Sequence, residues 1–437
     1  MSDLVIRGGT VVTSASVGVA DIAVTDGSIS AVGPNLAVDA EQEIDASGLH
    51  VFPGGIDSHV HFNEPGRTEW ETIANGSAAL AAGGYTAFVD MPLNNLPVTV
   101  DGPAFDLKLA AAKRASVVDF GFWGGLVPGK LDRLAELADR GVIGFKAFMC
   151  PSGIDEFPAC DEKTLREGMK RIAQLDSILL VHAEDPAKLT NPKGPSARDF
   201  LESRPWEAEV SAVHDAIAWA REAGCRLHIV HVSWVPSAVL IEVAREDGAD
   251  VSGETCPHYL LYSEDDLERL GGLGKSAPPF RMAKSLDAMW TSLVEGSLQM
   301  VVSDHSPSTL ALKQGDDFRK IWGGISGCQS TRQLLLAQNR LDLQSVAALT
   351  STNVAKRFGL PHKGDVAPGF DADLWLVDLS HDDVVRREDL LYRNPFSVHE
   401  GQPIRGRTVW TLVRGRTVFA EGRAVADSGG RMVRRAI

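Results

Sequence analysis

The sequence predicts an α/β protein, a (β/α)8 TIM barrel carrying a small β-sandwich domain formed by both ends of the chain. Its 437 residues, 44% of them hydrophobic, suit one large barrel with an appendage. The middle alternates short apolar runs with longer helix-period segments, whereas both ends carry only short alternating runs. We predict three segments: 1–52 and 363–437 as the two parts of the β domain, and 53–362 as the catalytic barrel.

Short strands separated by turns are predicted at both ends. LVIRGGTVV (4–12) and DIAVTDGSISAVG (21–33) alternate apolar and polar residues around Gly and Asp-Gly turns, as hairpins do. ADLWLVDL (372–379), TVWTLVRGRTVFAEG (408–422) and RMVRR (431–435) have the same character. This shared character predicts that the two ends meet in one domain.

Eight strand–helix units are predicted between them. The strands should end at His61, Asp90, Trp123, Lys146, His182, His231, Glu254 and Asp304. Helix-period segments follow at 71–83, 102–114, 131–141, 163–174, 208–224, 236–248, 282–296 and 329–339. Regular alternation of this kind favours a closed parallel barrel.

Charge and cysteine usage exclude several classes of protein. The net charge of −15, from 58 acidic and 43 basic residues, argues against nucleic acid and anionic membranes as partners. Five scattered cysteines form no CxxC pair, so neither a disulfide framework nor a thiolate zinc site is expected. MSDLVIRGGTVV lacks the features of a signal peptide, and apolar runs are strand-sized. We therefore expect a cytoplasmic enzyme.

Metal-binding side chains stand at the predicted strand ends. In a TIM barrel the catalytic face lies at the carboxyl ends of the strands. Those ends carry His59, His61, Lys146, His182, His231 and Asp304. Residues two apart in a strand face the same side, so His59 and His61 can grip one ion.

Each of these residues alone has an ordinary structural explanation. A single strand-end histidine is more often a hydrogen-bonded core or surface residue, Lys146 could be ion-paired, and Asp304 could cap a helix. Six such groups together would be costly in a core unless they were paired, which favours a metal site. Imidazoles and a carboxylate suit zinc better than calcium or magnesium. An ammonium repels metal, but carbon dioxide could convert Lys146 to a carbamate.

Several long motifs resemble a known family. GGIDSHVHFNEPGR (54–67), AAGGYTAFVDMPLNN (81–95), ETCPHYL (254–260), SAPPFR (276–281), SDHSP (303–307) and WGGISG (322–327) are similar to those of the amidohydrolase superfamily. The resemblance covers nearly the whole chain. It is to the cyclic-amidase branch, which contains dihydroorotases, dihydropyrimidinases (hydantoinases) and allantoinases, and it is strongest to the allantoinases.

The resemblance implies a binuclear hydrolase. His59, His61, Lys146 and Asp304 would hold one divalent ion, and Lys146, as N6-carboxylysine, would hold a second with His182 and His231. A hydroxide shared by two zinc ions would attack a cyclic amide, with Asp304 as the catalytic proton shuttle. The implied reaction is the opening of allantoin, a cyclic ureide, to allantoate in purine catabolism, and the implied assembly is a homotetramer.

Three residues are candidate substrate contacts. Asn63 stands where dihydroorotases usually carry an arginine, and it cannot supply that charge. KAFMCPSG lacks the tyrosine that hydantoinases place after the lysine, which leaves metal polarisation or Ser152 to stabilise the oxyanion. Asn94 could contact substrate or merely form a turn. A broad-specificity hydantoinase, a mononuclear hydrolase and a non-catalytic scaffold remain as alternatives.

Overall fold

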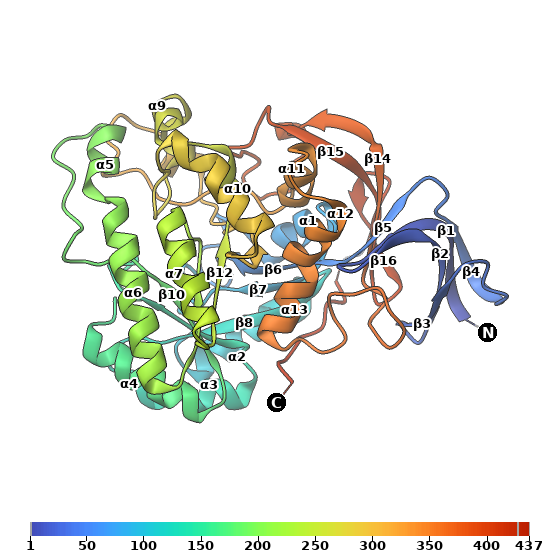
Figure 1. Cartoon of the computed structure of the whole chain (residues 1–437), viewed down its shortest axis with the longest axis horizontal. Helices are drawn as coiled ribbons and strands as arrows, with labels where there is room; N and C mark the ends of the chain where they lie inside the picture. The colour runs from blue at the N-terminus through green and yellow to red at the C-terminus, as the bar shows by residue number, and fades with distance from the viewer. Residues whose placement is uncertain (1, 426–427, 437) are drawn as a thin grey trace.

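A parallel barrel occupies one side of the molecule, and a sheet built from both ends of the chain occupies the other (Figure 1). The structure, a computed structural model, describes residues 2–425 and 428–436. The barrel strands are β6 (Gly55–Val60), β7 (Tyr85–Asp90), β8 (Asp119–Gly125), β9 (Gly144–Phe148), β10 (Ile178–His182), β11 (Arg226–Ile229), β12 (Val251–Thr255) and β13 (Met300–Val301). They pair in parallel in chain order, and a parallel bridge between Val60 and His305 joins the last segment to the first. The predicted barrel is confirmed.

Helices cover the outside of this barrel. They are α1 (Ile73–Ala82), α2 (Gly102–Ala115), α3 (Leu134–Arg140), α4 (Glu162–Gln174), α5 (Ala197–Ser203), α6 (Trp206–Ala223), α7 (Val235–Glu246), α8 (Pro257–Leu261), α9 (Leu267–Leu270), α10 (Leu286–Val294), α11 (Thr331–Ala337), α12 (Leu343–Ala347) and α13 (Asn353–Phe358). Side chains of Thr72, Asp101 and Asp161 cap the first turns of α1, α2 and α4. Each helix-period segment of the sequence contains a helix. Five short helices, α5, α8, α9, α12 and α13, lie outside the predicted segments, and none exceeds seven residues.

Strand alternation separates the inside of the barrel from the layer beneath the helices. In β10, Ile178 and Leu180 join an inner apolar cluster, whereas Leu179 and Val181 pack in the outer cluster with the helices. His182 has the same parity as Ile178 and Leu180, so it continues the inner row. The pleat therefore brings this histidine to the barrel axis.

The two ends of the chain meet, as predicted, and their strands form one nine-stranded sheet where a β-sandwich was expected. Its strands are β1 (Ser2–Val12), β2 (Val17–Thr25), β3 (Ser28–Gly33), β4 (Ala40–Asp45), β5 (His50–Pro53), β14 (Leu374–Val384), β15 (Pro403–Val413), β16 (Arg416–Ala420) and β17 (Arg423–Ala424). β5 joins the halves, since it pairs with β1 on one side and β14 on the other. At an irregularity between Ile6 and Gly9 the sheet branches, and β4 pairs with the first half of β1. Apolar side chains from both ends, including Leu4, Val24 and Leu374, form its core.

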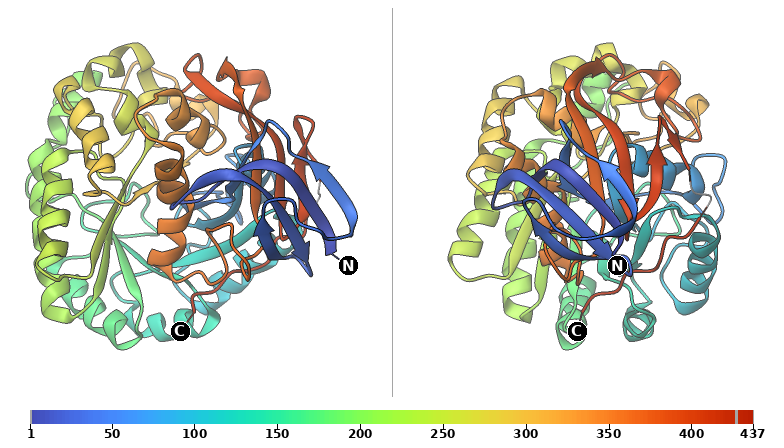
Figure 2. Two further views of the ribbon diagram at one scale, coloured as in Figure 1. Left: turned by 45° about the vertical axis from the view of Figure 1, so that its right-hand side comes forward. Right: turned by 90° about the vertical axis from the view of Figure 1, so that its right-hand side faces the viewer.

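The last stretch of chain leaves this sheet. RMVRR was expected in the β domain, but Met432 makes a parallel bridge with Phe120 of β8 and Val433 N–H donates to the Phe120 carbonyl at 2.7 Å. The C-terminus accordingly lies beneath the barrel, away from the N-terminus (Figures 1 and 2). That expectation was wrong because an exposed β-like run can pair with any free strand edge. The other domain boundaries stay predictions.

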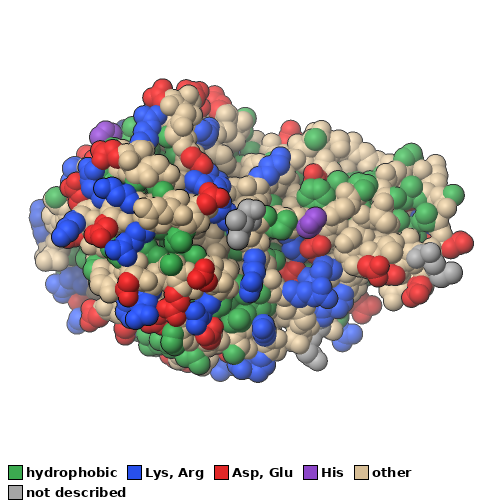
Figure 3. Space-filling view, turned by 90° about the horizontal axis from the view of Figure 1, so that it is seen from below, with side chains coloured by type: hydrophobic (Ala, Val, Ile, Leu, Met, Phe, Trp, Pro, Cys, Tyr) green, Lys and Arg blue, Asp and Glu red, His purple; other side chains and the backbone are tan. Residues whose placement is uncertain are grey.

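The surface charges, the cysteines and the helices fit the expectations drawn from the composition. Basic and acidic side chains are interspersed over the barrel side of the face in Figure 3. All five cysteines are free thiols in buried positions. Each helix among the described residues is too short or too polar for a bilayer crossing.

Candidate metal centre

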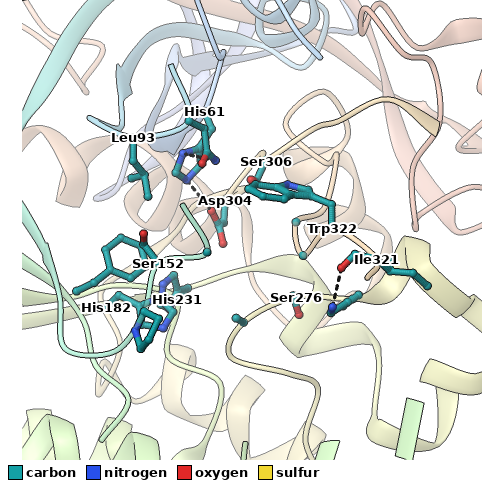
Figure 4. Close-up of a pocket in the computed structure, with 18 of the residues that line it drawn as sticks. His61, Leu93, Ser152, His182, His231, Ser276, Asp304, Ser306, Ile321 and Trp322 are labelled. Carbon is teal, nitrogen blue, oxygen red and sulfur yellow. Dashed lines mark hydrogen bonds and ion pairs between the residues drawn. The ribbon is translucent and has the colours of Figure 1, made fainter. Parts of the chain in front are cut away.

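Five of the six predicted ligands line one cavity at the carboxyl ends of the barrel strands, and Figure 4 labels four of them, His61, His182, His231 and Asp304. The sixth, Lys146, lies beside Phe148, which also lines the cavity. Five of them come from the last two residues of a strand or from up to three residues beyond it, whereas Lys146 is the middle residue of β9; the six are His59, His61, Lys146, His182, His231 and Asp304. The ring centres of His59 and His231 lie 5.5 Å apart, and those of His182 and His231 lie 4.6 Å apart. All four imidazoles are buried, at 6% exposure or less. Strands distant in sequence therefore present a compact set of donors.

Asp304 lies against the His-x-His pair. Its Oδ1 is 3.2 Å from Nε2 of His59 and 3.4 Å from Nε2 of His61. These three residues form a group whose ligand atoms could share one ion. Burial alone would raise the pKa of Asp304, but the His59 and His61 imidazoles outweigh it and keep the pKa below its usual value. An ionised carboxylate thus faces the centre.

Lys146 is a buried amine without a partner. Its Nζ makes no hydrogen bond within the described residues and lies 4.9 Å from the ring centre of Phe148. Burial lowers the pKa of Lys146 to about 7, although Asp304 and Glu254 act in the opposite direction. A neutral amine is the form that reacts with carbon dioxide.

Glu254 lies behind His59 and contacts its imidazole. The sequence analysis assigned Glu254 no role. Its Oε1 accepts from Nδ1 of His59 at 2.6 Å, and its Oε2 lies 3.0 Å from Nε2 of His228. A bond to Nδ1 leaves Nε2 of His59 as the ligating nitrogen. Burial lowers the pKa of His59, since it penalises the charged imidazolium. The sequence did contain a signal for this role, because Glu254 ends the seventh predicted strand.

His182 has a similar support. Glu184 Oε2 lies 2.7 Å from Nε2 of His182, and the Arg204 guanidinium pairs with the same carboxylate. Burial opposes ionisation of Glu184, but Arg204 and His182 hold its pKa below the usual range. Cys150 lies beside this pair, with Sγ 3.7 Å from Arg204 Nη2. Glu184 follows His182 by two residues, so the same strand parity could have indicated it.

Unusual backbone conformations concentrate at this site. His231 and Asp304 have φ values of 40° and 45°, and Asn63 and Asn94 have φ values of 62° and 74°. Left-handed conformations are uncommon for residues other than glycine and cost free energy. The surrounding packing holds these four residues in place, which is typical of functional sites.

A cavity of about 350 Å³ opens over the centre. Its walls include metal-site residues, the 151–153 turn and the loop that carries Trp322, which lies near Asp304 and Ser306 in Figure 4. Arg204 and Lys275 also reach the cavity, as does Ser276, which the sequence analysis did not single out. A cavity of this size suits a small ligand.

The three candidate substrate contacts differ in placement. Asn94 lines the cavity, with Nδ2 3.4 Å from Nδ1 of His61. Ser152 also lines it, but its hydroxyl donates to the Phe157 carbonyl at 2.6 Å. Asn63 is buried beside the centre and donates to the Pro307 carbonyl at 3.2 Å, outside the residues that line the cavity. Of the three, Asn94 is best placed for a ligand.

Comparisons with known proteins agree with this geometry. The amidohydrolase family matches residues 50–411. The chain is 52% identical to an allantoinase of Rubrobacter xylanophilus and 50% identical to one of Solibacter usitatus, over 99% of this chain and 97% of each relative. An L-hydantoinase (dihydropyrimidinase) from Arthrobacter aurescens superimposes with a TM-score of 0.97 at 32% identity, covering all of both chains. On the family match, the full-length identity and the shared barrel, the chain belongs to the amidohydrolase family.

Proposed function

We propose that this protein hydrolyses the hydantoin ring of allantoin to give allantoate. The observation that carries the proposal is full-length similarity to allantoinases in a chain where five of the six candidate ligands line one cavity and the sixth, Lys146, lies beside Phe148 of that lining. The chemistry is that of a cyclic amidase, in which one ring C–N bond is broken by water.

The residues at the centre fit a pair of divalent ions. His59, His61, Asp304 and Lys146 would hold one ion, and Lys146, His182 and His231 the other. Burial lowers the pKa of His59, His182 and His231 and so favours their neutral imidazoles, and zinc favours such donors beside one ionised carboxylate. When bound, such ions polarise a carbonyl and lower the pKa of water towards about 7.

Carboxylation of Lys146 would complete this ligand set. The Nζ atom is buried and has no hydrogen-bond partner among the described residues, a costly state for an amine. Attack of the neutral amine on carbon dioxide forms an N–C bond and releases a proton, leaving a carbamate with two ligating oxygens. The modification thus replaces an orphaned amine by an anion among the imidazoles.

Asp304 is the proposed proton carrier. It lies at the floor of the cavity with part of its carboxylate exposed, at 15%. The carboxylate takes a proton from the attacking water and delivers it to the ring nitrogen as the C–N bond breaks. Water is thereby divided between the two ends of the opened ring, with OH on carbon and H on nitrogen.

A broad-specificity hydantoinase is the second candidate, because the L-hydantoinase structure matches so closely. The sequence Cys150-Pro151-Ser152 stands in the stretch where hydantoinases carry a tyrosine, which favours allantoin. The test is a panel of allantoin, hydantoin, dihydrouracil and dihydroorotate with metal-reconstituted protein. We expect kcat/KM to be highest for allantoin, and a preference for hydantoin or dihydrouracil would reject the proposal.

Metal analysis tests the non-catalytic alternative. About two ions per chain after reconstitution would support the enzyme, whereas a chain that binds none would support a scaffold. A single ion with Lys146 unmodified would support a mononuclear hydrolase. The expected homotetramer and cytoplasmic location stay predictions.

A further inference from the structure

Residues 318–324, which we call the wall segment, form one side of the cavity. Six of them, 319–324, line it, including Ile321 and Trp322 (Figure 4). The wall segment contains no helix or strand, so no regular ladder fixes its shape. Other contacts must therefore hold the wall segment in place. The width of the cavity depends on the position in which they hold it.

Two buried lysines bind the carbonyls of the wall segment. Lys275 Nζ donates to the carbonyls of Phe318 and Ile321, the latter at 2.6 Å. Lys313 Nζ donates to the carbonyls of Trp322 and Gly324, the former at 3.0 Å. Four carbonyls within seven residues therefore point at two ammonium groups.

Main-chain bonds from the same neighbourhood reinforce this arrangement. Gly324 N–H donates to the Lys275 carbonyl at 2.8 Å, and Trp322 N–H donates to the Leu312 carbonyl at 2.9 Å. Gly324 has a φ of 147°, and a Cβ built there would lie 2.4 Å from the Ser306 carbonyl oxygen. Glycine is thus required where the wall segment passes close to the segment that follows Asp304.

These lysines differ from the ion-paired buried lysines of the chain. Lys108 pairs with Asp90 at 2.6 Å, and Lys363 lies within 2.8 Å of three aspartates. In the described part of the chain, neither Lys275 nor Lys313 has a carboxylate within 4.0 Å, although their exposures are only 8% and 5%. Burial lowers the pKa of Lys275 to about 8 and that of Lys313 to about 7.

An unpaired buried ammonium is expensive, and an apolar side chain of similar length would avoid that cost. A methionine could fill the same space but could not bind carbonyls. We propose that Lys275 and Lys313 are positioning residues that fix the wall segment and so set which cyclic amide the cavity accepts. Trp322 is the side chain they place, with its ring 4.7 Å from that of Trp70.

The test compares Lys313→Met with the wild type, because Lys313 lies behind the wall segment and outside the cavity lining. In the metal-loaded full-length chain, amide hydrogen exchange of peptides covering 312–325 should become roughly tenfold faster. The KM for allantoin should rise roughly tenfold with a smaller change in kcat, since tenfold corresponds to about 1.4 kcal/mol, the order of one lost charged hydrogen bond. Metal content should not change.

Lys320→Met is the matched control, because the Lys320 side chain belongs to the wall segment but is 84% exposed. It should leave exchange at 312–325 unchanged. If Lys313→Met fails to fold, Lys313→Gln, which keeps a donor without the charge, should give an intermediate exchange rate. Exchange within twofold of wild type in Lys313→Met would overturn the inference.

The KM measurement rests on the proposed function, whereas the exchange measurement does not. If the wild type fails to hydrolyse allantoin, the proposed function is rejected while faster exchange still supports the role of Lys313. If the wild type is active and exchange is unaffected, only the positioning role is rejected.

Discussion

Replacing Glu254 by glutamine should weaken metal binding without removing any ligand. Oε1 of Glu254 accepts from Nδ1 of His59 at 2.6 Å, whereas Oε2 lies 3.0 Å from Nε2 of His228 without forming a hydrogen bond to it. An amide keeps only one accepting oxygen and turns an NH2 group towards the other imidazole. His59 then either loses its acceptor or keeps a neutral one in place of the carboxylate.

The size of the effect follows from these contacts. A hydrogen bond to a charged group contributes about 1.5–3 kcal/mol, and loss of a group that orients a ligand typically costs about 10–100-fold in metal affinity. The Glu254 side chain is completely buried, so water cannot replace the lost acceptor. We expect the affinity for the ion held by His59 to fall by about 10–100-fold.

The assay is competition with a chelator, with bound metal measured after dialysis. Ser252→Ala is the matched control, because Ser252 Oγ bonds Nδ1 of His228 at 2.7 Å and does not touch His59. That variant should lose some stability but retain metal. Wild-type affinity in Glu254→Gln would refute the idea that this carboxylate orients His59.

Three further predictions concern single side chains. Asp304→Asn should keep the barrel fold, shown by circular dichroism, and reduce kcat by about 10²–10⁴-fold, the usual contribution of a general acid–base; near-normal turnover would contradict the shuttle role. Lys146→Ala should lose bound metal, with partial recovery of activity in added short carboxylic acids; full metal content without them would contradict the carbamate. In the wild type, the pKa of Lys313 is lowered to about 7 in the folded state, so the unfolded state binds more protons than the folded state between pH 7 and 10.5. The free energy of unfolding should therefore rise with pH in that range. Lys313→Met should show a shallower rise in urea titrations, and an equal slope would contradict the lowered pKa of Lys313 in the folded state.

Much of the fold was predictable because its signals are local. Alternating apolar runs and helix-period segments located all eight barrel strands, with each end within three residues of the observed one. The run 431–435 was misplaced because a strand-like pattern does not say which edge it will join. Its backbone pairs with Phe120 at the start of β8, a contact between distant parts of the chain.

The candidate ligands were visible because metal chemistry restricts residue type and the barrel restricts position. The glutamates behind them were less visible. The positions of Glu254 and Glu184 relative to the predicted strand ends gave a signal, but only the structure shows which imidazole each of them contacts, His59 and His182. Lys275 and Lys313 are indistinguishable from surface lysines in the sequence, because their partners are backbone carbonyls, which no residue pattern records.

During synthesis, strand β5 emerges long before one of its two partner strands. One edge of β5 pairs with β1, but its other edge needs β14, which begins 321 residues later, from Pro53 to Leu374. At ~5–20 residues per second, a ribosome takes roughly 16–64 s to cover that interval. For that time the nascent chain displays an unsatisfied strand edge of the kind that recruits other chains. Production of the protein should therefore depend on chaperone supply and on translation speed through the barrel-coding region.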